Sequence, residues 1–510
     1  MKQLSGIYIL LLAAVFCACS EEAVDEPDMP DFIRIESGLT SLTAPPEGGP
    51  VKIRFSTNSD WEATATFGNG SLPGELLSYS GGKGECELLF TATPNTGSGS
   101  RTSLISITAG RASAEISIVQ NAIEVTLPDE AEVREYLVRL YEENDGPNWR
   151  FREKWCSDLP INEWGSQIKY ENGRLELILS ENNLTGSINL SGCKALTSIR
   201  CSKNRITSLD VSDCPLLTHV DCTNTGLEHA DFSGCLSLRE VSAGYNNLSR
   251  LDLGWCSTLT QLRVPYCNLE ELNLDNCVLI ESVQCNNNRL TRLEIPWRRH
   301  LQDVFCYENR IITLDVSDSP LLKILNCGDN DIDNLNVGGS PYLRWIFCYN
   351  NRLTALDTSD QKTSLTCFYC YSNRLSSLDV SGYYNLSELH CSDNDIDSID
   401  IKGCRNLRWL YCSHNKLEEL DFSGVEPTSL ERIDVSHNRL RRADLTGFPY
   451  LMRLWCAGNL IGGEIPEHFS RLAEFEYDVR YDYSPSTGTY VDRGYGWWYP
   501  GEPEKMSHTK

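Results

Sequence analysis

The chain has 510 residues and a formal net charge of −26 at pH 7. A chain of this length exceeds what one hydrophobic core normally supports, so we expect several domains. The strong negative charge argues against nucleic acid and anionic lipid surfaces as partners, and it favours a soluble surface that repels copies of itself.

Residues 1–18 have the pattern of a targeting segment. Lys2 supplies the charged start, residues 7–16 supply an apolar core, and Ala18 precedes Cys19. The apolar run is too short for a stable transmembrane helix. A small residue directly before a cysteine, after a short apolar run, resembles the signal of bacterial lipoproteins. The resemblance implies that Cys19 is lipidated and that the lipid is the only membrane contact; the alternative is an ordinary secretory peptide cut nearby.

Acidic residues and prolines follow this cysteine. Ser20-Glu21-Glu22 resembles the acidic export tag of surface lipoproteins in gut-type Gram-negative anaerobes, which implies anchoring in the outer membrane with the protein facing the cell exterior. The alternative is a solvated linker without an export role. Residues 19–31, with Pro27 and Pro30, are predicted to form a tether.

Residues 32–122 are predicted to form a small β-sandwich. Apolar and polar residues alternate at 51–55, 104–107 and 116–118, and turn-forming residues separate these runs. Asn58-Ser-Asp-Trp61, the loop from Asn95 to Arg101 and the closing residues 118–120 resemble the BACON domain. That resemblance implies either a glycan- or mucin-binding module or a spacer. Trp61 is the residue that glycan binding would use, but a core or rim tryptophan of the sandwich is the interpretation that we favour.

Residues 127–174 are predicted to begin with a helix. Asp129 can cap its first turn and Glu132 can complete a capping box. Trp149, Trp155 and Trp164 follow, and we expect them to pack inside this segment instead of recognising a ligand.

Residues 175–461 repeat with a step of 21 residues, stretched to 22 or 23 only three times. In the type unit, Leu196, Ile199, Cys201 and Asn204 occupy positions whose residue types recur along the segment. The pattern L-x-x-L-x-[LC]-x-x-[NC]-x-L resembles the leucine-rich repeat. One coil of this length cannot bury its own apolar face, so successive coils must stack. We therefore predict a β-rich multidomain protein, with the sandwich followed by a capped leucine-rich-repeat solenoid whose parallel concave sheet has about 14 rungs.

The remaining repeat positions have structural interpretations. The inward Asn can bond backbone groups that each bend leaves unpaired, and Asp210 and its copies are expected to form turns on the back of the coil. Short extended or 3₁₀ segments are expected there.

Residues 127–174 resemble the N-terminal cap of plant-type leucine-rich-repeat proteins. Residues 462–510 are predicted to form a C-terminal cap, and a small strand-rich ligand module is the alternative for them.

Sixteen of the 22 cysteines fall into two columns of the repeat. We predict buried thiols that fill small slots, because side chains in register on parallel strands point the same way. Disulfides between neighbouring rungs are the alternative for an exported protein. The first column holds Cys201, Cys222, Cys285, Cys306, Cys327, Cys348, Cys370, Cys391, Cys412 and Cys456, and the second holds Cys193, Cys214, Cys235, Cys256, Cys277 and Cys404.

No motif in the chain indicates chemistry. The cysteines lack interleaved histidines at zinc spacing, and the acidic runs at 329–333 and 393–397 lack the glycine and final glutamate of a calcium loop. No P-loop, nucleophile elbow or zinc-protease motif is present. We predict a non-enzymatic protein without a cofactor or metal.

Three outward columns on the predicted concave face carry the candidate site. These are the columns of Ser198, Arg200 and Ser202, and they hold no aromatic residue in the first rungs. Contiguous outward rings favour recognition of a protein or peptide by a monomeric binding protein, with glycan recognition as the alternative. A cross-strand ladder that only stiffens the sheet is the structural alternative. The later rungs place here Phe305, Tyr307, Trp345, Phe347, Tyr349, Tyr369, Tyr371, His390, Trp409, Tyr411 and Trp455.

The lipoprotein motif gives the first test. If Cys19 carries the lipid, the Cys19→Ala variant is released from membranes, because no other segment is predicted to hold the protein there. Metabolic labelling with a palmitate analogue followed by membrane fractionation measures both effects. Label that persists on the variant contradicts the assignment.

Overall fold

The computed structural model describes residues 30–36, 38, 40–67, 74–76, 80–97, 99–296, 298–441, 448–456, 458–460, 481–484 and 489–492. Cys19 and the predicted targeting segment lie outside the described residues, as does most of 462–510. Within the described ranges, no helix combines the length and the apolar character needed to cross a membrane.

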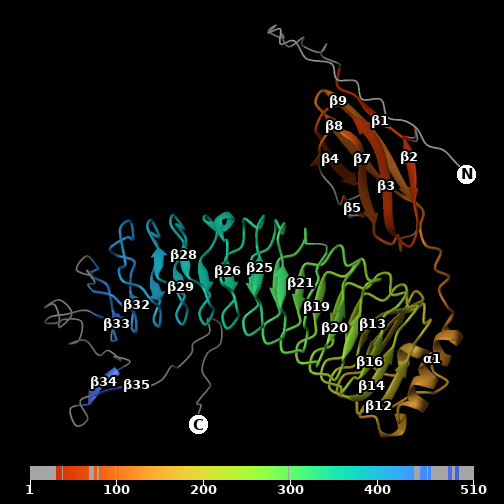
Figure 1. The fold of residues 1–510 in the computed structure, drawn as a ribbon. Coiled ribbons are helices and arrows are strands. Elements are labelled where there is room, and N and C mark those ends of the chain that lie inside the picture. The colour runs from red at the N-terminus through yellow and green to blue at the C-terminus, as the bar shows by residue number, and fades with distance from the viewer. Residues whose placement is uncertain are drawn as a thin grey trace, which may run out of the picture.

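The N-terminal strands form two facing sheets, which confirms the predicted sandwich (Figure 1). One sheet has the order β1-β3-β7-β5 and the other β2-β9-β8-β4-β6. Neighbours run antiparallel except β2 and β9, which pair in parallel. Phe55 and Phe90 fill the core between the sheets. The bounds are β1 Ile33–Ile35, β2 Ser41–Ala44, β3 Gly49–Thr57, β4 Trp61–Phe67, β5 Gly74–Leu76, β6 Ser80–Gly81, β7 Gly84–Ala92, β8 Arg101–Ala109 and β9 Ala112–Gln120.

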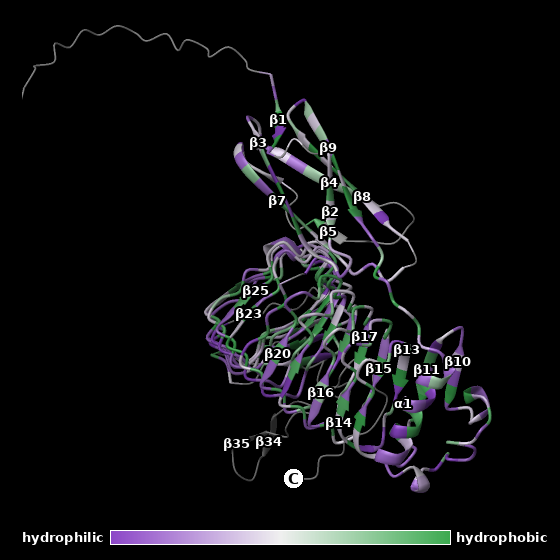
Figure 2. Cartoon of the chain, turned by 90° about the vertical axis from the view of Figure 1, so that its right-hand side faces the viewer, coloured by the Kyte–Doolittle hydropathy of each residue, from purple (hydrophilic) through white to green (hydrophobic). Residues whose placement is uncertain are grey.

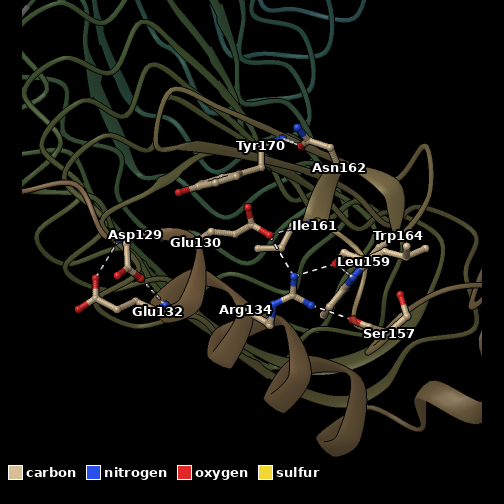
Figure 3. Close-up of polar contacts among 10 residues, drawn as sticks. All are labelled: Asp129, Glu130, Glu132, Arg134, Ser157, Leu159, Ile161, Asn162, Trp164 and Tyr170. Carbon is tan, nitrogen blue, oxygen red and sulfur yellow. Dashed lines mark hydrogen bonds and ion pairs between the residues drawn. The ribbon is translucent and has the colours of Figure 1, made fainter.

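Helix α1 (Glu130–Glu143) begins the cap with the predicted capping box. The Asp129 side chain accepts from the Glu132 amide at 2.9 Å, and the Asp129 amide donates to Glu132 Oε2 at 3.1 Å (Figure 3). Figure 3 also shows Arg134 beneath the loop that follows the helix, where it donates to the carbonyl oxygens of Ser157 and Leu159 at 2.8 and 2.7 Å. These bonds fix the loop against the helix.

Two short 3₁₀ helices, η2 (Gly146–Asn148) and η3 (Ile161–Glu163), follow in the cap. Trp149, Trp155 and Trp164 are buried and contact one another, with ring centroids 4.9 and 5.8 Å apart. The prediction that they pack is therefore confirmed. Strand β10 (Ile168–Glu171) then pairs antiparallel with the first rung and covers the edge of the sheet.

The solenoid is built on one long sheet of 15 strands, of which β10 is antiparallel and the other 14 run parallel. This confirms the predicted number of rungs. Figure 2 shows hydrophobic residues recurring on the strands of successive coils. The rungs are β11 (Arg174–Ile178), β13 (Leu196–Arg200), β15 (His219–Asp221), β17 (Glu240–Ser242), β19 (Gln261–Arg263), β21 (Ser282–Gln284), β22 (Asp303–Phe305), β24 (Ile324–Asn326), β26 (Trp345–Phe347), β27 (Cys367–Tyr369), β29 (Glu388–His390), β31 (Trp409–Tyr411), β32 (Arg432–Asp434) and β33 (Arg453–Trp455).

Shorter parallel sheets form the opposite side of the coils, where extended or 3₁₀ segments were predicted. One further 3₁₀ helix, η4 (Ser359–Gln361), and an antiparallel hairpin of β34 (Tyr481–Ser484) and β35 (Thr489–Asp492) complete the described elements. The strands of this side are β12 (Thr185–Asn189), β14 (Arg205–Asp210), β16 (His229–Asp231), β18 (Arg250–Asp252), β20 (Glu271–Asn273), β23 (Thr313–Asp315), β25 (Asn334–Asn336), β28 (Ser377–Asp379) and β30 (Ser398–Asp400).

The inward asparagines join neighbouring coils, as predicted. Asn204 Nδ2 donates to the carbonyl oxygens of Leu179 and Cys201 at 2.8 Å each, and its Oδ1 accepts from the Leu184 amide at 2.9 Å. Where another residue replaces the asparagine, it still donates one of these hydrogen bonds. Thr225 Oγ1 donates to the Cys222 carbonyl, and Cys267 Sγ donates to the Ala243 carbonyl. Each coil therefore satisfies backbone groups of its own turn and of the preceding one.

The two cysteine columns are buried, apart from the half-buried Cys456, and the cysteines of the described residues are free thiols. In the second column the thiol also donates to a carbonyl of the preceding coil, as Cys235 does to Val211 at 3.1 Å and Cys404 to Val380 at 3.1 Å. Ser340 and Gln361 occupy the same slot and donate to equivalent carbonyls. That column is thus a hydrogen-bonding position as well as a packing position, which the sequence pattern did not reveal.

The aspartate column forms turns on the back of the coil, as predicted. Asp210 Oδ1 accepts from the Ser212 amide at 3.0 Å, and Asp379 does the same for Ser381 at 2.8 Å. Asp444, the last member of the column, lies outside the described residues. Across the ranges that the structure describes, no group of three or more His, Cys, Asp or Glu side chains could hold a metal ion.

Candidate functional site

The register of the long sheet aligns the outward columns across the later rungs. Phe347 pairs with Tyr369, Tyr369 with His390, and His390 with Tyr411. Directly opposite side chains on paired strands lie close enough to touch. The repeat therefore converts a sequence spacing of one coil into direct contact between rings.

Five side chains form a nearly continuous row along this face. The ring centroids of Phe347 and Tyr369 are 5.0 Å apart, those of Tyr369 and His390 4.5 Å, and those of His390 and Tyr411 4.0 Å. Trp455 continues the series 6.2 Å from Tyr411. We call Phe347, Tyr369, His390, Tyr411 and Trp455 the aromatic row; all five are half-buried.

The row carries no formal charge at neutral pH. Burial lowers the pKa of His390 to about 3, so its imidazole is neutral. Burial and the neighbouring Glu388 raise the pKa of the Tyr369 phenol, whose hydroxyl donates to Glu388 Oε2 at 2.5 Å. Two carboxylates lie next to the row: Glu388 bonds Tyr369, and Asp434 is opposite both Tyr411 and Trp455 in register.

The expectation that every predicted ring points into solvent is wrong for Tyr349, which is only 4% exposed. Its ring lies over Gly328 on the preceding coil, where an added Cβ would come within 2.5 Å of the ring. Tyr371 stacks on it with centroids 4.8 Å apart and an interplanar angle of 3°. The missing side chain at Gly328 leaves room for Tyr349 to pack down on the sheet.

The tryptophans of the first column differ in exposure. Trp345 is 44% exposed, which makes it the most accessible ring of the predicted set. Trp409 is half-buried beneath the Arg432 guanidinium, which lies 4.6 Å from the ring centroid. Phe305 and Tyr307 are half-buried. They are separated from the other rings by β24, which carries no ring in these columns. The candidate surface spans β26 to β33, because Trp455 lies 6.2 Å from Tyr411 across β32, which also carries no ring in these columns.

Trp61 does not offer the sugar platform that the resemblance to the BACON domain suggested. It is 4% exposed and packs edge-to-face against Phe55, with centroids 5.1 Å apart. An open pocket of about 510 Å³ is lined by Trp61 together with Asp60, Glu62 and Gly81. The core interpretation of Trp61 is the one that the structure supports.

Two exposed tyrosines were missed in the sequence. Tyr245 and Tyr266, 56% and 46% exposed, stack with centroids 4.9 Å apart at the turn that follows the rungs β17 and β19. Both have positive φ, like Lys203 at the same position of the type unit. The sequence does contain a signal for this pair. An aromatic residue occurs in two consecutive coils at the position of Lys203, directly after the third outward column.

No protein-family model and no curated protein matches the chain. Solved structures do. The functional domain of InlJ from Listeria monocytogenes, described as including a cysteine ladder, is 25% identical over 56% of this chain and 58% of that one, with a TM-score of 0.44. YopM from Yersinia enterocolitica is 23% identical over 56% of this chain and 65% of that one, also with a TM-score of 0.44.

A leucine-rich-repeat protein from Leptospira interrogans is 17% identical over 58% of this chain and 90% of that one, with a TM-score of 0.43. The chain thus spans less than two thirds of the InlJ and YopM chains that it matches. The repeat, the parallel sheet and the asparagine ladder together make the solenoid a leucine-rich-repeat fold.

The lowered pKa of His390 predicts a pH-dependent stability. The unfolded imidazole binds a proton near pH 6.5, whereas the folded one does so only near pH 3. Above pH 6.5 the imidazole is neutral in both states, so the free energy of unfolding is not reduced by protonation. As the pH falls to about 5.5, the free energy of unfolding decreases by up to roughly 1.4 kcal/mol, because only the unfolded state binds the proton. The His390→Phe variant lacks this titration. Urea unfolding of parent and variant at about pH 7.5 and pH 5.5 measures the difference. A free-energy gap that stays constant between the two pH values contradicts the burial of His390.

Proposed function

We propose that this chain is a non-enzymatic binding protein and that its ligand is a protein or peptide seated on the outward face of the long sheet between β26 and β33. The observation that carries the proposal is the aromatic row with the exposed Trp345 beside it. Contiguous apolar surface of this kind marks an interaction site more often than it marks plain surface.

The mutual packing of the rings favours tight binding. Tyr and Trp bury a large area at a small cost in side-chain entropy, and they are the commonest anchors of protein interfaces. In the aromatic row each ring is already held by its neighbours, so little further ordering is needed when a partner docks. Rings that only stiffen the sheet would pack in the same way. Binding measurements therefore distinguish a ligand-binding role from a purely structural one.

A protein partner accounts for the observations better than a glycan does. The rings of the row are half-buried, and Tyr369 and His390 stack face to face, so that each covers part of the other, whereas a sugar stacks on an open ring face. Trp61, the ring that the sandwich was expected to offer to a glycan, lies in the core. The sandwich is accordingly assigned the role of a spacer.

We also propose that this surface is displayed outside the cell. The N-terminal motif supports anchoring through a lipid on Cys19, and Ser20-Glu21-Glu22 supports export to the outer face of the outer membrane. The sandwich lies in the chain between that anchor and the solenoid, so it would hold the aromatic row away from the membrane.

The double variant Trp345→Ala with Trp409→Ala tests the binding role. Binding is expected to fall by about thirtyfold or more, since a buried aromatic anchor typically contributes about 2 kcal/mol. Stability should fall much less, by roughly 1–2 kcal/mol, because one ring is exposed and the other half-buried. Calorimetric titration with a ligand selected from a screen of surface proteins and random peptides measures the first effect, and thermal unfolding measures the second.

The matched controls lie on the same face at the end without rings. Arg200→Ala, Asp221→Ala and Gln284→Ala are expected to leave binding nearly unchanged, because these side chains precede the aromatic row by several rungs. A double variant that binds like the parent while melting much lower would identify the rings as a stiffening ladder. The stacked Tyr245 and Tyr266 would then be the next surface to test.

A further inference from the structure

Two arginines face each other at the far end of the aromatic row. Arg432 on β32 and Arg453 on β33 are directly opposite in register, in the same column as Trp409. Neighbouring strands are about 4.8 Å apart, and like charges directly opposite on them destabilise a sheet. A pair of this kind persists only if something offsets the repulsion.

Neither arginine forms an ion pair of 4.0 Å or less within the described residues. The Arg432 side chain bonds the Tyr411 hydroxyl, and the charge of Asp434 also acts on that hydroxyl. The nearby carboxylates are already engaged elsewhere. Glu431 pairs with Arg408 at 2.7 Å, and Asp434 accepts from the Ser436 amide and hydroxyl at 3.0 and 2.6 Å. The chain as a whole has a net charge of −26, so two opposed arginines without a direct ion pair in the described residues form a local cationic site.

An aromatic ring holds one of the two guanidinium groups. Arg432 lies 4.6 Å from the centroid of Trp409, and its Nε is buried without a hydrogen-bond partner. Arg453 is exposed, and its neighbour Trp455 ends the aromatic row. A guanidinium held over a ring is fixed in place, and the low dielectric beside the rings strengthens its attraction for an anion.

We propose that Arg432 and Arg453 form a subsite for a carboxylate, and that it receives an Asp or Glu side chain of the protein ligand. The inference rests on the proposed function and adds the chemistry of the partner. Two arginines opposite in register can each donate to one oxygen of a carboxylate, and an acidic side chain removes the repulsion between them. The ligand segment would then place apolar residues along β26 to β31 and an acidic residue over β32 and β33.

The negative charge of the chain is compatible with this partner. Charges farther away than about 8 Å are largely screened at physiological ionic strength, so the contact with the two arginines decides the local preference. Long-range repulsion slows association instead of preventing it, and added salt is expected to speed association with an acidic peptide.

The test uses the full-length protein and peptides selected from a random display library. A selected peptide is synthesised with its acidic residue as Glu and again as Gln, which has the same shape without the charge. The parent protein is expected to bind the Glu form at least about tenfold more tightly, as a charge-assisted hydrogen bond predicts. The Arg432→Gln, Arg453→Gln double variant is expected to lose that preference and still bind the Gln form within about threefold of the parent. Arg200→Gln, on the same face at the ring-free end, should keep the preference.

The outcomes separate the two proposals. If the parent binds both peptides equally while Trp345→Ala weakens both, the subsite is refuted and the proposed function stands. If Trp345→Ala weakens neither, the proposed function itself fails. A melting temperature close to that of the parent shows that the double variant is folded, because the lost repulsion offsets the lost contact with Trp409. Arg453→Lys, which keeps the charge, should retain the preference for Glu. A preference that survives in the double variant overturns the assignment of these arginines.

Discussion

The hydrogen bonds of the buried asparagines are the interaction on which the rest of the solenoid depends. Each coil bends sharply after its rung, at a residue with positive φ such as Lys203. Asn351 then bonds the carbonyls of Cys327 and Cys348 and the amide of Ile332, and so connects two coils. A buried backbone group without such a partner costs about 1–3 kcal/mol, which makes the repeated asparagine a requirement of the fold.

This ladder is also what creates the candidate site. Because every coil is fixed against the previous one, the outward residues of successive rungs fall into straight columns. A ring repeated once per coil must then contact its copy, and an arginine repeated once per coil must face its copy. The aromatic row and the opposed arginines are two consequences of one register. Together they give the outward face of the long sheet an apolar stretch that ends in two cationic side chains.

The periodic features could be predicted from the sequence because they depend on spacing alone. The rungs, the asparagine ladder and the capping box at Asp129 are local or repeated patterns. Side-chain exposure could not be predicted in the same way. Tyr349 is buried because the residue one coil earlier is Gly328, which leaves room for its ring. Such outcomes depend on which neighbour the fold supplies, and the pattern of the residue itself does not contain that information.

The location of the ligand is the central claim, and footprinting of the complex tests it most directly. Full-length protein with and without a selected ligand is exposed to hydroxyl radicals, and side-chain oxidation is located by mass spectrometry. The account predicts that bound ligand protects Trp345, Trp409 and Trp455 while leaving Tyr245 and Tyr266 as reactive as before. Protection confined to Tyr245 and Tyr266, or to the N-terminal sandwich, would contradict it.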